Sequence, residues 1–170
     1  KLNSLAQMNP PIRSIKHQLG LWKGIKNGTV DVIGSDHAPH TLEEKKNQWP
    51  HSPSGMPGVQ TTLSIMLNHV NNKKLSLPKL VELLSENPCK IYDIKNKGFI
   101  KKNYDADITV VDINKDIIIR NKNMASKSGW TPYDNMKLKG VPIATIVNGE
   151  IKMLNGKTID KPNGKAVDFN

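Results

Sequence analysis

The sequence predicts an α/β fold: the C-terminal part of a TIM-like α/β barrel followed by strands of a small β-sandwich domain. Three observations predict this fold. A β-branched run ends in a polar motif, apolar residues then recur at helical spacing, and the rest of the chain is rich in short β-type runs. The barrel segment is expected at residues 1–97 and the β-rich accessory domain at residues 98–170.

The first expected element is a strand at residues 29–36, "TVDVIGSD". Its β-branched residues favour extended backbone, and Gly34 precedes the polar motif. A long segment rich in Pro, Ser, Gly and His follows at residues 39–58. Loops of that length without secondary structure of their own are usually functional or mobile. We therefore expect a functional loop directly after the strand.

Helices are expected after Pro57 and Gly58. The pattern "SLPKLVELLSEN" predicts a second helix, with Ser76 or Leu77 as its N-cap and Pro78 in its first turn. A third, short helix is expected from Pro88 to about residues 96–98. The apolar face of the first helix is expected at Val59, Leu63, Met66, Leu67 and Val70.

The remaining elements are predicted to be strands. The runs "ADITVVDI", "DIIIR" and "PIATIVNGEIKML" are rich in β-branched residues. Asn148 and Gly149 lie at the centre of "VNGE", which is a strong signal for a two-residue hairpin turn. This half is expected to be β-rich.

The chain is too short to be a whole barrel. Closure needs eight strand–helix units and about 250 residues, whereas the chain has 170 residues and does not begin with Met. We expect a fragment of a longer protein. A smaller fold that mimics the pattern is the alternative.

Composition narrows the partners and the compartment. The net charge is +10, but only Arg13 and Arg120 are arginines and aromatics make up 5%. Arginine binds phosphate groups through paired hydrogen bonds, and aromatic rings stack on bases. Because both residue types are scarce here, no nucleic-acid partner is expected. There is no apolar run of membrane-spanning length and no signal peptide. The single cysteine, Cys89, fits a reducing compartment, and we expect a cytoplasmic protein.

The motif "GSDHAPHT", residues 34–41, concentrates the candidate chemistry. Asp36 would sit at the C-terminal end of the strand, where α/β barrels place catalytic groups. Its carboxylate could bind a metal or carry a proton, and the His40 imidazole could contact a substrate carbonyl or carboxylate. The alternative is a plain turn in which Asp36 caps backbone amides.

Further segments add context to this motif. "MNPPIRS", "SDHAPHT", "PSGMPGVQT" and "SKSGWTPYDNMKLKGVPIATIVNGEI" occur in this order along the chain. Together they resemble the dihydroorotases of the larger class, within the cyclic amidohydrolase superfamily of metal-dependent hydrolases. Hydantoinases and allantoinases look similar around the Asp-His pair, but the second histidine of "DHAPH" together with "NPP" favours dihydroorotase.

The resemblance implies a reaction and roles for particular residues. The family interconverts L-dihydroorotate and N-carbamoyl-L-aspartate in pyrimidine biosynthesis, with one or two zinc ions. Asp36 matches the aspartate that binds zinc and acts as acid and base. Asn9, His40, Ser54 and Gly55 match positions that contact the substrate.

The resemblance also shows what the chain lacks. The family's other metal ligands, which include a His-x-His pair, belong to earlier barrel strands, and the chain contains no His-x-His. The isolated chain is therefore expected to be inactive. An inactive partner of aspartate carbamoyltransferase, or a hydantoinase or allantoinase, remain alternatives, and a homodimer is allowed.

The histidines outside the matched positions are expected to have structural roles or to lie at the surface. His37 is adjacent to Asp36 but matches no role, and a structural hydrogen bond is expected for it. The remaining histidines, His17, His51 and His69, are expected at the surface.

Overall fold

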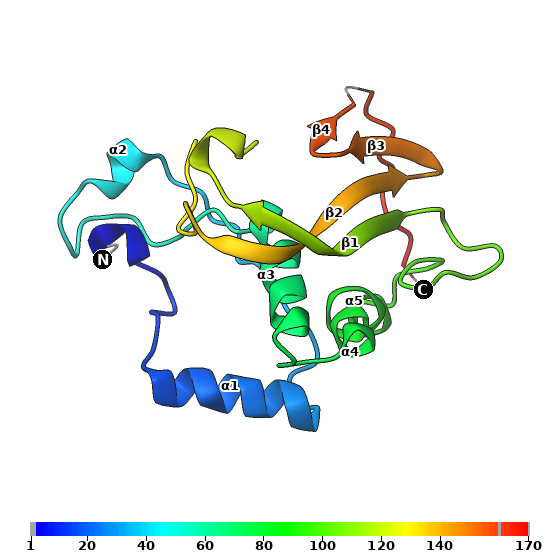
Figure 1. Ribbon diagram of the computed structural model, residues 1–170, viewed down its shortest axis with the longest axis horizontal. Helices are drawn as coiled ribbons and strands as arrows, with labels where there is room; N and C mark the ends of the chain where they lie inside the picture. Colours follow the sequence, from blue (N-terminus) through cyan, green and yellow to red (C-terminus); the bar gives the residue numbers. More distant parts are fainter. Residues whose placement is uncertain (1–2, 160, 170) are drawn as a thin grey trace.

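A computed structural model describes residues 3–159 and 161–169. A four-stranded sheet lies at one end of the molecule and α1 at the other, with α3 and α4 between them (Figure 1). The elements in chain order are η1 Asn3–Ala6, α1 Ile15–Asn27, α2 Leu42–Lys45, α3 Val59–Asn71, α4 Leu77–Val81, the π-helical turn η2 Glu82–Glu86, α5 Asn87–Ile91, β1 Ile108–Ile118, η3 Asn121–Asn123, β2 Lys137–Val147, β3 Glu150–Leu154 and β4 Lys157–Thr158.

The sheet confirms the predicted β-rich half. Its strands are antiparallel in the order β1-β2-β3-β4. Asn148 and Gly149 form the two-residue connection between β2 and β3, with φ values of 48° and 79°. Two successive positive φ values are what a tight hairpin turn with the twist of the strands requires. The predicted runs at residues 106–113 and 116–120 join into the single strand β1, with a register shift between Asp112 and Asp116.

The helix α3 connects the sheet to the other helices. Leu67 is 1% exposed and, with Met66 and Leu80, forms the centre of the apolar core. A Cβ atom at Gly140 on β2 would lie 2.5 Å from the Leu67 Cβ atom, and the φ of Gly140 is 106°. Only glycine allows this close approach of helix and strand. The predicted apolar face of α3 is confirmed except at Val59, which is exposed.

The helical stretch from α4 to α5 differs from the prediction at its end. Ser76 caps α4 by accepting a hydrogen bond from the Lys79 amide, as predicted. Pro88 has no N–H to donate to the preceding turn, which accounts for the π-helical turn η2 before it. The prediction that the last helix reaches residues 96–98 was wrong, because α5 ends at Ile91 and Asp93 has a left-handed φ of 54°.

The predicted strand at residues 29–36 is not formed. Its contacts are instead with the helical stretch: the Ile33 amide donates to the Leu83 carbonyl at 3.1 Å, and Asn87 Nδ2 donates to the Asp31 carbonyl at 2.8 Å. A strand needs a neighbouring strand for its hydrogen bonds, and none lies beside this segment within the described residues. The predicted loop at residues 39–58 also contains the short helix α2.

The observed fold is therefore a mixed α/β arrangement with one antiparallel sheet. The barrel, the β-sandwich and the boundary between residues 97 and 98 stay predictions. No residue of α1 is buried, and its Ile15 and Leu19 are 66% and 62% exposed. In the described part of the chain, none of the helices combines the length and apolar character that crossing a bilayer requires.

Candidate functional site

The segment that carries Asp36 runs beside residues 54–58. His37 and Met56 form a parallel β-bridge. A Cβ atom at Gly58 would lie 3.0 Å from the Ser35 carbonyl oxygen, which shows how closely the two backbones approach. Asp36 lies within this contact with a left-handed φ of 43°, and the residue is exposed. Aspartate tolerates this conformation better than most residues, and backbone held in such regions is common at functional sites.

Gly55 explains how the two segments can come so close. Its φ is 132°, and a Cβ atom there would lie 2.5 Å from the Ala38 carbonyl oxygen. Both the conformation and the contact exclude any other residue unless the backbone shifts. The sequence singles out Gly55 as a substrate contact by resemblance. The structure adds a steric reason for glycine at this position.

His40 contacts the same loop. Its Nε2 atom lies 3.2 Å from the Ser54 carbonyl oxygen, and its Nδ1 atom lies 3.8 Å from Glu44 Oε2. Glu44 also completes a capping box with Thr41 at the start of α2. Hydrogen bonds from the Thr41 amide and side chain lower the pKa of Glu44, so it stays a carboxylate beside His40.

A buried tryptophan from the β-rich half holds the backbone of His40. Trp130 is 2% exposed, and its indole Nε1 donates a hydrogen bond to the His40 carbonyl at 2.7 Å. Gln60 adds a second link between the two halves, because it donates to the Asn123 carbonyl and accepts from the Ala125 amide. The orientation of the "DHAPH" segment thus depends on both halves of the chain.

The N-terminal segment joins the site through Gly55. The Gly55 amide donates to the Gln7 carbonyl at 2.9 Å, two residues before the exposed Asn9. The structure therefore brings together His40, Ser54, Gly55 and the segment of Asn9. The neighbours of Asp36 contact this loop, because His37 bridges to Met56 and the Ala38 carbonyl lies against Gly55. Within the described residues, no hydrogen bond engages its carboxylate.

His37 has the structural role expected for it. Its Nδ1 atom accepts hydrogen bonds from the amides of Gly58 and Val59, at 3.1 Å and 3.4 Å. These amides begin α3, whose first N–H groups have no partner within the helix. Because Nδ1 is the acceptor, the neutral ring carries its proton on Nε2. The spacing of the motif gives no hint of this partner, which lies 21 residues along the chain.

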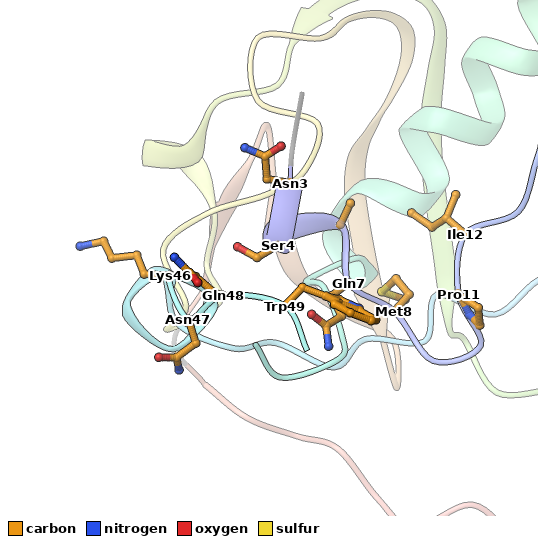
Figure 2. A pocket seen from close by; sticks show the side chains of 11 residues that line it. Asn3, Ser4, Gln7, Met8, Pro11, Ile12, Lys46, Asn47, Gln48 and Trp49 are labelled. Atoms are coloured by element: carbon orange, nitrogen blue, oxygen red, sulfur yellow. The ribbon is translucent and has the colours of Figure 1, made fainter. Parts of the chain in front are cut away.

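Two open cavities lie outside the predicted site. The first, of about 760 Å³, lies between η1 with the residues after it and residues 46–49, and Figure 2 shows Trp49 beside Met8 and Gln7 along it. The second, of about 900 Å³, has many apolar residues from α3, α4 and β1 in its wall. None of the five predicted site residues lines either cavity.

Comparison with known proteins fixes the family. The sequence profile of the amidohydrolase family matches residues 7–152. The chain belongs to the amidohydrolase family. The match includes every predicted site residue, from Asn9 to Gly55.

Similar amidohydrolases are dihydroorotases and hydantoinases. A dihydroorotase of Pyrococcus furiosus is 42% identical over 97% of this chain, and one of Methanosphaera stadtmanae is 44% identical over 86%. The chain spans only 38% and 33% of these two relatives. Among solved structures, an L-hydantoinase (dihydropyrimidinase) from Arthrobacter aurescens is similar with a TM-score of 0.86 and 32% identity, over 93% of this chain and 36% of that one.

Metal chemistry is the expectation for an amidohydrolase, but the residues present do not supply a full set of metal ligands. Within residues 3–159 and 161–169, no group of three or more His, Cys, Asp or Glu side chains could hold a metal ion. A catalytic zinc needs about three protein ligands. Asp36 offers one free carboxylate, so these residues do not fit a complete metal centre. No reaction step through a metal follows from them.

One contact near the site was not predicted from the sequence. Lys45, the last residue of α2, is completely buried. It lies in the charged run "LEEKK", which is typical of a solvated surface, and nothing in that run distinguishes it from Lys46. Its partners are backbone carbonyls, which the sequence does not reveal.

Proposed function

We propose that this chain is the C-terminal part of a dihydroorotase, which reversibly hydrolyses L-dihydroorotate to N-carbamoyl-L-aspartate. The observation that carries the proposal is the similarity to dihydroorotases along 97% of the chain, at 42% identity in one case. The geometry is consistent with it. His40, Ser54 and Gly55 adjoin the exposed Asp36, as residues that share a substrate must.

In this reaction, each predicted site residue is assigned its own role. The Asp36 carboxylate accepts a proton as water attacks the ring amide and returns it to the departing amide nitrogen. The His40 imidazole and the Asn9 amide bind the polar groups of the substrate. The segment of Ser54 and Gly55 contacts the ring through its backbone. Each role is proposed from the resemblance and from the proximity of the segments.

The wider features of the enzyme are proposed as well. Zn²⁺ is the proposed metal, with Asp36 as one ligand and the others outside this chain. Residues 1–97 would complete an α/β barrel and residues 98–170 a β-sandwich. The extended segment at residues 29–36, which has no neighbouring strand within the described residues, and the exposed apolar side chains of α1 support a missing neighbour. A cytoplasmic location, a homodimer and contact with aspartate carbamoyltransferase belong to the same proposal.

The test is an assay of the longer polypeptide. The protein would be expressed with the residues that precede Lys1 in its gene and assayed in both directions, by ring opening of L-dihydroorotate and by cyclisation of carbamoyl aspartate. Turnover in both directions is expected, and the 170-residue chain alone should show none. A longer polypeptide without turnover in either direction would refute the proposal.

Hydantoin hydrolysis is the second candidate. The similarity to the L-hydantoinase structure, with a TM-score of 0.86 at 32% identity, favours it. The same preparation would be offered hydantoin, allantoin and dihydroorotate. Turnover of hydantoin without turnover of dihydroorotate would select this second function.

A further inference from the structure

Lys45 is a buried cation close to the proposed site. It ends α2, a single helical turn that begins with the Thr41 capping box directly after His40. The whole residue is 0% exposed, although lysine is almost never fully buried unless it is paired. Nothing in the proposed reaction uses its ammonium group.

Its ammonium group joins two distant segments. Nζ donates to the Pro53 carbonyl at 2.7 Å and to the Gln7 carbonyl at 3.1 Å. The Gln7 carbonyl also accepts the Gly55 amide at 2.9 Å, so both of its lone pairs are used. The backbone of Lys45 is fixed too, because Ser4 Oγ donates to its carbonyl at 2.7 Å.

The environment shows that these contacts are what makes the buried charge tolerable. No carboxylate in the described part of the chain forms an ion pair with Lys45. Burial lowers the pKa of Lys45, as expected for an ammonium group removed from water. The two carbonyl oxygens offset part of that cost. The same two oxygens belong to the segments that carry Asn9 and Ser54.

We propose that Lys45 is a positioning residue for substrate binding: its buried ammonium group fixes the segment of Asn9 against the loop of Ser54 and Gly55. The proposal rests on the proposed function, because it assigns these segments to the substrate. Asp36 has a further support that Lys45 does not contact, the hydrogen bonds of His37 to the start of α3. We therefore expect Lys45 to act on binding more than on the carboxylate.

The test replaces Lys45 by methionine, which keeps the apolar stem and removes the donors. In the longer polypeptide, Lys45→Met should raise KM for dihydroorotate about tenfold or more, since hydrogen bonds to charged groups are among the stronger ones. The kcat and metal content should change much less. Lys46→Met is the matched control, because Lys46 is exposed and Figure 2 shows its side chain pointing away from Gln7 and Met8. It should leave KM unchanged.

A second readout does not depend on turnover. Amide hydrogen exchange at Gly55 should accelerate in Lys45→Met, while the amides of α3 keep their protection. Ser4→Ala, a milder change in the same cluster, should give a smaller effect of the same kind. If the wild-type polypeptide does not turn over dihydroorotate, the proposed function fails, but the exchange at Gly55 still tests Lys45.

Two results would overturn the role of Lys45. The first is an unchanged KM together with unchanged exchange at Gly55. The second is a uniform loss of protection throughout α3 as well, because Lys45 would then support the overall stability and not the position of one loop. If Lys45→Met does not fold, Ser4→Ala with unchanged KM and unchanged exchange at Gly55 overturns the proposal equally.

Discussion

At the scale of single residues, Asp36 can be replaced by asparagine without a change in backbone conformation. Its φ of 43° lies in a region that asparagine adopts as readily as aspartate. Asp36→Asn should therefore keep the backbone while it removes the negative charge, the proton acceptor and the proposed metal ligand together. We expect kcat/KM in the longer polypeptide to fall at least about a hundredfold, the usual scale for losing a general acid–base group, with the melting temperature unchanged.

The control for Asp36 is Asp31→Asn. Asp31 is also exposed and lies in the same extended segment. Its substitution changes the net charge equally and should leave the rate unchanged. Near-normal turnover in Asp36→Asn would refute the proposed role of its carboxylate.

The sequence predicts some residues of this site and not others for a physical reason. Asp36 and His40 lie in one short motif, so their proximity follows from the chain itself. Lys45 looks like a surface lysine because its two partners are carbonyls of Gln7 and Pro53, and every residue has a carbonyl. A contact with backbone leaves no trace in the residue types. The same holds for the contact of His37 with the start of α3.

At the scale of elements, the start of α3 depends on a side chain from another segment. His37 accepts from the Gly58 and Val59 amides, where a serine or aspartate would usually act as the cap. His37→Ala should lower the free energy of unfolding by about 1 kcal/mol, as the loss of a helix cap does. Chemical denaturation would measure it. The exposed His51, replaced by alanine, is the control and should show no change.

A second element-scale prediction concerns the support of His40 by the β-rich half. Trp130→Phe keeps a buried ring and removes the donor to the His40 carbonyl. We expect a loss of about 1–3 kcal/mol in the free energy of unfolding, the cost of a buried unpaired polar group. KM should rise as well, because the backbone of His40 is released. Trp49 is 77% exposed, and Trp49→Phe should change neither quantity.

Elements that depend on local signals were predicted best. The hairpin at Asn148 and Gly149 and the cap of α4 at Ser76 each follow from a few adjacent residues, and both were confirmed. The strand expected at residues 29–36 was wrong for this structure, because a strand is defined by its neighbours. Here the segment contacts Leu83 and Asn87 on the helical stretch instead.

At the scale of the whole molecule, α1 is joined to the rest through a small aromatic contact. The Trp22 and His69 rings meet edge to face, with centroids 4.8 Å apart, and Lys74 Nζ lies 5.1 Å from the Trp22 ring centre. His69 was predicted to lie at the surface. That was wrong, because the residue is partly buried and its Nδ1 atom is buried without a partner within the described residues. His17 and His51 are exposed, as predicted.

This contact should make the stability of the molecule depend on pH. Burial first, and the positive charge of Lys74 second, lower the pKa of His69 below its ordinary value of 6.5. As pH falls through that ordinary value, His69 becomes protonated in the unfolded chain but stays neutral in the folded chain. The free energy of unfolding should therefore decrease as pH falls, until pH reaches the lowered pKa of the folded state. Urea unfolding between about pH 8 and pH 5 would follow it.

Substitution of His69 separates this effect from those of the other histidines. His69→Gln cannot be protonated, so the fall in the free energy of unfolding with decreasing pH should be smaller than in the wild type. Lys74→Met should also reduce the fall, because removing the nearby positive charge brings the pKa of His69 closer to 6.5. His51→Gln should leave the pH dependence as it is, since His51 is exposed. An equal pH dependence in His69→Gln and the wild type would show that protonation of His69 is not linked to folding.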